Sequence, residues 1–456
     1  MKKENENCLP IGKFFAWKSR DISVASITVI VTGYLSIFCT DTLGIKPAVV
    51  GIILLISKLL DVVTDFITGY LVDNTNSKLG KGRPYELSII GSWVCSVLLF
   101  SCPAGWEKNV KIAWIFCMYT LVFSVFNSFL GACNNPYMIR AFKNKEVITK
   151  VASFGGIVTM LGSAIVSITF PIAMGKIATS AGGWRTLILL YAIPLTLIGI
   201  LRFIFVKEDP SIDARSESKK IDVKEVFLMF KENKYAWAYA GVTGMYNLCV
   251  GMSVNTYYFK YIVGDVSKLS LVNMLSILML PVMFVFPKLM KKMQVSNLIE
   301  LGVGIGAAGY FLLFFAKANI PVIIIGNVMV SMASLPICYL GVLIIMELAT
   351  YNEWKGMSRM EGSTNIISNF ATKAFNGIGV GVQGILLSAF GYMNATSTEI
   401  VTQPDSALLA IRLLYSLIPM AIYFVIIFCA TRLGKLEKQL PKMEAEVQKR
   451  SENAKK

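Results

Sequence analysis

The sequence predicts an all-α membrane protein, with twelve transmembrane helices arranged as two six-helix bundles. Of its 456 residues, 55% are hydrophobic, and the mean hydropathy is +0.61. Apolar runs near the length of about 20 residues that a bilayer-crossing helix needs recur from end to end. One long polar interruption, residues 207–234, has six such runs before it and six after it.

The predicted spans follow one another with short polar connections. In order they cover residues 22–40, 49–72, 87–102, 112–137, 151–175, 187–206, 235–263, 269–287, 298–316, 321–348, 366–391 and 408–431. We expect an N-terminal bundle over 1–206, a cytoplasmic linker over 207–234, a C-terminal bundle over 235–432 and a basic cytoplasmic tail over 433–456. Apolar residues at helical spacing in the linker predict a short helix on the membrane surface, with a disordered connector as the alternative.

Basic residues gather at the N-terminus, in alternate loops after it and in the C-terminal tail. Positive charge stays on the cytoplasmic side, so both termini are expected inside, in a plasma membrane protein. The net charge of +16 then reflects this bias and attraction to anionic lipid. Membrane lipids, and not nucleic acid, are the expected partners of this charge.

Histidine is absent, and the nine cysteines include no Cys-x-x-Cys pair. A zinc site or a disulfide framework is therefore not expected, and any proton handling must rest on carboxylates. No P-loop is present, and no cofactor is expected. The glycine patterns GVGIGAAG (302–309) and GVGVQG (379–384) lie inside apolar runs, where small residues allow close helix packing and not dinucleotide binding.

A charged stripe lies inside the second apolar run. Lys58, Asp61 and Asp65 are spaced i, i+3 and i+7, which places them on one helix face, with Thr64 beside them. An ionisable group at mid-membrane costs about 2.5–3.5 kcal/mol, so the stripe must face the bundle interior or a water-filled cavity. Its hard oxygens suit a small cation or a proton. The alternative is a buried ion pair that only holds helices together, although two acids and one base leave one negative charge uncompensated.

Other polar residues recur inside the predicted spans. Lys373 forms a stripe with Asn369 and Asn376 in the eleventh run. Further amides and hydroxyls are Asn127, Ser128, Asn134 and Asn135 in the fourth run, and Asn247 and Asn255 in the seventh. Such groups suit a neutral polyhydroxylated ligand, and each alone is equally compatible with an interhelical hydrogen bond.

Three segments carry a family resemblance. They are GYLVDNTNSKLGKGRP (69–84), directly after the aspartates, YNEWKGMSRMEG (351–362) and YLSIFCTDTLGI (34–45). Together they resemble the glycoside–pentoside–hexuronide:cation symporters of the major facilitator superfamily, the family of the bacterial melibiose permease. The resemblance covers nearly the whole chain and implies the major facilitator fold.

The resemblance also implies roles for individual residues. Asp61 and Asp65 match the carboxylates that hold the coupling cation, and Thr64 stands at an asparagine ligand of the melibiose permease. Lys373 matches a lysine near both sites. Residues expected in coupling and in closing the cytoplasmic side are Lys58, Asp73, Arg83, Glu353 and Arg359.

The sugar-binding positions of this family are matched less well in this sequence than the cation-binding positions. Asn134 stands where the melibiose permease has one galactoside-binding aspartate. The second such aspartate, on helix one, aligns without gaps with Ala25. Asp21, one turn earlier, is either the substitute or a cytoplasmic helix cap. The expected substrate contacts are Asn134, Asp21, Lys373, Asn247 and Asn376, and melibiose itself is not the expected substrate.

The sequence therefore predicts a secondary active transporter and not an enzyme. We expect a monomer that couples Na⁺ or H⁺ entry to uptake of a sugar or glycoside by alternating access. A lysolipid or other amphiphile carrier on the same fold is the main alternative, and a transport-like sensor without turnover is another.

Overall fold

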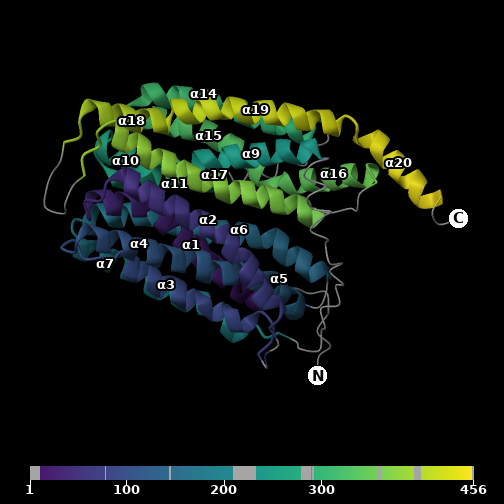
Figure 1. Cartoon of the computed structure of the whole chain (residues 1–456), viewed down its shortest axis with the longest axis horizontal. Coiled ribbons are helices and arrows are strands. Elements are labelled where there is room, and N and C mark those ends of the chain that lie inside the picture. The colour runs from purple at the N-terminus through teal and green to yellow at the C-terminus, as the bar shows by residue number, and fades with distance from the viewer. Residues whose placement is uncertain are drawn as a thin grey trace. The chain divides into compact units, whose positions relative to one another are not determined.

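The computed structural model describes residues 11–75, 77, 79–142, 145–208, 233–278, 289, 292–356, 361–394 and 402–453. These residues form helices joined by short turns, and no β-strand occurs among them (Figure 1). The all-α prediction is confirmed. The predicted linker helix lies outside the described residues, as do Arg359 and the side chain of Asp73.

The chain divides into two compact units. The first comprises residues 1–217, 255–277 and 384–407, and the second comprises 218–254, 278–383 and 408–456. The first unit thus contains two short segments from the second half of the chain. The predicted domain boundaries at 206, 234 and 432 stay a prediction.

The first unit is built around α1, which packs against both α6 and α7. Its helices are α1 (Ile11–Asp41), α2 (Pro47–Asp73), η1 (Arg83–Leu87), α3 (Ser88–Leu99), α4 (Lys108–Thr120), η2 (Leu121–Asn127), α5 (Ser128–Ala141), α6 (Lys145–Ile177), α7 (Ala181–Phe205), α10 (Asn255–Tyr261), η3 (Val266–Lys268) and α11 (Leu269–Leu278). Local sequence explains several ends: Pro47 opens α2, and Ser180 caps α7 by accepting a hydrogen bond from the Gly183 amide.

The second unit is built around α14, which lies beside α15 and α19 (Figure 1). Its helices are α9 (Lys234–Gly251), α14 (Val295–Ala316), α15 (Ile320–Tyr339), α16 (Gly341–Trp354), most of α17 (Glu361–Ala389), α18 (Asp405–Tyr415), α19 (Leu417–Glu437) and α20 (Leu440–Asn453). Glycines bring α14 close to α15: a Cβ at Gly302 would lie 2.7 Å from the Met332 carbonyl oxygen, and one at Gly309 would lie 2.7 Å from the Gly326 carbonyl oxygen. The GVGIGAAG pattern is thus used for helix packing, as the sequence predicts.

Eight helices among the described residues are long and apolar enough to cross a membrane. They correspond to the first, second, fourth, fifth, sixth, ninth, tenth and twelfth predicted spans. The other four differ for identifiable reasons: α3 has 12 residues, the seventh span is broken between α9 and α10, the eighth runs beyond the described residues, and α17 carries the polar stripe around Lys373. A multi-pass membrane protein is confirmed, while the number twelve is not confirmed by this criterion.

Candidate cation and substrate sites

A ladder of polar contacts joins α2 to the helix formed by α4, η2 and α5. The Ser57 and Thr120 hydroxyls lie 2.9 Å apart, Ser124 donates a short hydrogen bond to the Asp61 carboxylate, and Ser128 Oγ donates to Asp65 Oδ1 at 2.7 Å. The rungs recur every four residues on both sides, as helix geometry requires for residues on one face. The two aspartates therefore face neighbouring helices and not lipid.

The residues of this ladder differ in exposure and in local geometry. Asp61 is buried and Asp65 is half-buried, while Ser57 and Ser124 are fully buried. The partner helix is π-helical over Leu121–Asn127, directly at the Asp61 rung. Such π segments inside α-helices recur at functional sites.

Lys58 lies at one end of the acidic pair. Its ammonium is 3.8 Å from Asp61 Oδ2 and 4.6 Å from the centre of the Phe123 ring, so it is held by a carboxylate and an aromatic face together. The formal charges of Lys58, Asp61 and Asp65 sum to −1. Thr64 directs its hydroxyl hydrogen to its own helix, at the carbonyls of Leu60 and Asp61, so only its oxygen lone pairs face other ligands.

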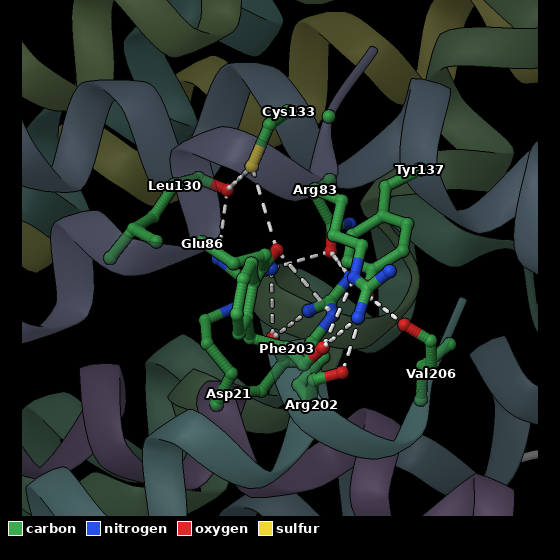
Figure 2. A network of polar contacts seen from close by, with 12 residues as sticks. Asp21, Arg83, Glu86, Leu130, Cys133, Tyr137, Arg202, Phe203 and Val206 are labelled. Carbon is green, nitrogen blue, oxygen red and sulfur yellow. Dashed lines mark hydrogen bonds and ion pairs between the residues drawn. The ribbon is translucent and has the colours of Figure 1, made fainter. Parts of the chain in front are cut away.

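A second charged cluster joins α1, η1, α5 and α7 near the start of α1 (Figure 2). Arg202 is fully buried, with its guanidinium 3.2 Å from the centre of the Trp17 ring. Glu86, also buried, lies 3.5 Å from Arg202 and 3.5 Å from Arg20. We call Lys18, Arg20, Asp21, Glu86, Asn134 and Arg202 the arginine cluster.

The arginine cluster contains two residues that the sequence predicts as substrate contacts. Asp21 Oδ1 lies 3.2 Å from both Arg20 and Arg202, and Asn134 Oδ1 accepts hydrogen bonds from Arg20 at 2.6 Å and Arg202 at 2.9 Å. The structure therefore brings Asp21 and Asn134 together through shared arginines. The side-chain carbonyl oxygen of Asn134 already accepts both of these hydrogen bonds. Its side-chain N–H groups and the partly exposed Asp21 carboxylate are left for a ligand.

The alternative that Asp21 caps a helix is wrong, because α1 begins at Ile11 and Asp21 lies in its interior. Arg20, Glu86 and Arg202 were not predicted as site residues. The signal was present for Arg202, which is a basic residue inside an apolar run, as Lys58 and Lys373 are.

The loop after α2 closes on a carboxylate from beyond α7. The main-chain amides of Lys81 and Gly82 each donate to Glu208 at 2.8 Å, and that of Arg83 donates at 2.5 Å. Gly80 has a φ of +114°, and a Cβ at Gly82 would lie 2.8 Å from the Cys133 carbonyl oxygen, which explains both glycines of the GKGRP segment. The Arg83 guanidinium donates to the Phe203 carbonyl at 2.9 Å (Figure 2). Glu208 was not predicted because it lies 125 residues away from Arg83 in the sequence.

The second unit holds the remaining predicted residues. Asn376 of α17 donates to the Asn247 carbonyl of α9 at 3.4 Å, and the Asn247 amide donates within α9 to Thr243 at 2.9 Å. These two predicted substrate contacts therefore lie together. Lys373 is half-buried one turn before Asn376, and Glu353 is half-buried at the end of α16.

Comparison with known proteins identifies the class. The family model described as MFS/sugar transport protein matches residues 19–435. Since this match spans most of the chain, the protein is a multi-pass membrane transporter and not an enzyme. It belongs to the MFS/sugar transport protein family, and it is a sugar transporter.

Similar proteins support this assignment. The isoprimeverose transporter of Lactiplantibacillus pentosus is 27% identical over 99% of this chain and 94% of that relative. The lactose permease of Leuconostoc lactis is 23% identical over 85% of this chain and 62% of its own length. Among solved structures, the nucleoside transporter NupG has a TM-score of 0.61 at 13% identity, covering 95% of this chain and 100% of that one. At that identity the likeness shows the fold alone.

Proposed function

We propose that this transporter is a symporter that couples a monovalent cation, Na⁺ or H⁺, to uptake of a sugar or glycoside by alternating access. The observation that carries the proposal is the ladder in which Asp61 and Asp65, one turn apart on α2, each accept a hydrogen bond from a serine of the neighbouring helix. Carboxylate and hydroxyl oxygens are the ligands that a small, hard cation prefers. Asp61, Asp65 and Thr64 form the proposed cation site, to which the structure adds Ser124 and Ser128 as candidate ligands.

The charge on this site explains how binding would control the carrier. Lys58 compensates part of the acidic charge, and one monovalent cation brings the formal charge of Lys58, Asp61 and Asp65 to zero. A neutral site is closed off from water on both sides at less cost than a charged one, so cation binding favours the occluded state through which the carrier with substrate switches. One charge moving through about 100 mV supplies about 2.3 kcal/mol, which corresponds to about fifty-fold accumulation.

Asn134, Asp21, Lys373, Asn247 and Asn376 are the proposed substrate contacts. The arrangement that supports this is the pairing of Asn247 with Asn376 in one unit and the joining of Asp21 with Asn134 in the other. The names of relatives, an isoprimeverose transporter, a lactose permease and a glucuronide carrier protein homolog, point to glycosides as the substrate class.

Four residues take the proposed gating roles beside Lys58. They are Asp73, Arg83, Glu353 and Arg359. We place the protein in the plasma membrane as a monomer, surrounded by membrane lipids and with both termini cytoplasmic, following the distribution of basic residues.

Purified protein in proteoliposomes tests the proposal. Uptake of isoprimeverose, lactose and a glucuronide is measured with an inward Na⁺ gradient, with an inward H⁺ gradient, and with neither. The proposal predicts accumulation of one or more of these glycosides only with a cation gradient, and its loss in Asp65→Asn. Equal accumulation in Asp65→Asn and wild type would contradict the assigned cation site. Equal uptake with and without a cation gradient would contradict symport.

A further inference from the structure

A second acidic group lies at the other end of α1, outside both sites described above. Asp41, 8% exposed, accepts hydrogen bonds at one carboxylate oxygen from Thr40 at 2.7 Å and from the Tyr392 hydroxyl at 2.6 Å. Its other oxygen accepts from Tyr261 at 2.5 Å and forms a short ion pair with Lys260. We call Thr40, Asp41, Tyr257, Lys260, Tyr261 and Tyr392 the Asp41 cluster.

The donors of the Asp41 cluster come from segments remote in the sequence. Lys260 and Tyr261 lie on α10, and Tyr392 follows α17, yet both segments pack in the first unit with α1. Two further contacts hold α10 on α1: Thr256 donates to the Gly33 carbonyl at 2.9 Å, and the Thr40 and Tyr257 hydroxyls lie 3.1 Å apart. The cluster thus holds two pieces of the second half of the chain against the first helix.

The boundaries of these two pieces differ in structure, since one lies at a helix break and the other inside a continuous helix. The helix breaks at 252–254, between α9 and α10, where the second unit gives way to the first. The α17 helix passes from the second unit to the first between Gln383 and Gly384. Gly384 approaches the Pro47 carbonyl and Gly51 of α2 so closely that no Cβ fits there. This close approach therefore depends on glycine.

The Asp41 cluster behaves as one cooperative set because its carboxylate is desolvated. A buried carboxylate is tolerated only while its donors are in place, so separation of α10 from α1 exposes Asp41 to water together with Lys260 and the tyrosines. A partly opened cluster would leave the carboxylate buried with fewer donors, so partial opening is unfavourable.

We propose that the Asp41 cluster is a latch that keeps the ends of α10 and α17 on α1, and that transport requires it to open once in each cycle. On the predicted topology this end of α1 faces the outside. The latch rests on the proposed alternating-access function, and it assigns Asp41, Lys260 and Tyr392 a positioning role.

Hydrogen exchange of the full chain in lipid nanodiscs tests the latch without any substrate. Asp41→Asn removes the charge that pairs with Lys260 and weakens the hydrogen bonds from the two tyrosines Tyr261 and Tyr392. Tyr392→Phe removes one hydroxyl while keeping the ring that packs edge-on against Tyr257 and Tyr261. We expect the amides of α10 to exchange about tenfold faster or more in Asp41→Asn and severalfold faster in Tyr392→Phe, with α6 and α7 unchanged. Asp405→Asn, at an exposed aspartate in the part of α18 that belongs to the first unit, is the matched control and should leave α10 unchanged.

The outcomes separate the latch from the proposed function. Unchanged α10 exchange in both variants overturns the latch, and so does a uniform rise that includes α6 and α7, since that indicates a purely structural role. Faster exchange confined to α10, together with an altered rate of glycoside counterflow in Tyr392→Phe, supports it. Since exchange is read without a ligand, a failure of glycoside uptake in wild-type proteoliposomes contradicts the proposed function alone.

Discussion

Two of the buried charged groups in the first unit, the acidic pair of α2 and the arginine cluster, are stabilised in opposite ways. On α2, two carboxylates are met by serine hydroxyls and one ammonium, and the three charged residues sum to −1. In the arginine cluster, two buried guanidiniums and Lys18 meet Asp21 and Glu86, and the sum is +1. Hydroxyl contacts are single and rotatable, whereas a guanidinium offers five donors in a rigid plane. The first arrangement suits a site whose occupant changes, and the second suits a fixed joint between helices.

The largest expected effect is the loss of stability when the arginine cluster, the fixed joint between helices, is disrupted. Arg202→Ala leaves Glu86 without one of its two arginines and empties a fully buried space beside Trp17. Removing one partner of a buried ion pair costs about 3–5 kcal/mol, so the variant should lose most of its folded yield or melt far below wild type in detergent. Arg432→Ala, at an exposed position of α19, is the control and should melt as wild type does. A wild-type melting temperature for Arg202→Ala would show that the cluster is not a structural joint.

Asp65→Asn should have the opposite effects, with transport impaired and stability retained. It keeps the shape of a half-buried side chain and its contact with Ser128, so the melting temperature should change little. Cation-driven accumulation, about fifty-fold for one charge at about 100 mV, should fall to simple equilibration while some sugar binding remains. Uptake at a range of imposed membrane potentials measures this. Retained accumulation would move the cation site away from α2.

Ser128→Ala sharpens the comparison by identifying the ion. Loss of an oxygen ligand should raise the Na⁺ concentration for half-maximal uptake by about tenfold if sodium is the coupling ion. If the ion is a proton, uptake should be independent of Na⁺ in wild type and in Ser128→Ala alike. Ser163→Ala is the matched control, because that hydroxyl donates within its own helix to Met160. If uptake depends on Na⁺ and the Na⁺ concentration for half-maximal uptake is unchanged in Ser128→Ala, Ser128 is not part of the site.

The smallest expected effect is that of Asn134→Ala. Its carbonyl oxygen is shared by Arg20 and Arg202, which keep Glu86 and Asp21 as partners, so the fixed joint survives. We expect a severalfold change in the glycoside concentration for half-maximal uptake, with no change in cation dependence. A shift in cation dependence would show that the two charged groups are coupled through α5, which carries both Ser128 and Asn134.

The sequence predicts the α2 site better than the arginine cluster, for a physical reason. Lys58, Asp61 and Asp65 lie on one helix, so their spacing alone places them on one face. The arginine cluster draws its members from α1, η1, α5 and α7, and no periodicity relates residues so far apart. The same limit explains why Ser124 and Glu208 were not predicted. Ser124 donates to Asp61 of another helix, and Glu208 accepts from a loop amide 125 residues earlier in the chain. The fold class was predicted because hydropathy and span length are local properties, and they depend on no distant partner.

The loop that closes on Glu208 has a consequence for how this transporter can vary. Side-chain ion pairs can be exchanged in evolution by compensatory swaps, because acid and base can trade places. Glu208 is gripped mainly by three main-chain amides, and an amide cannot be mutated into an acceptor. A second-site suppressor search starting from Glu208→Lys should therefore yield reversion at position 208 and no charge reversal elsewhere.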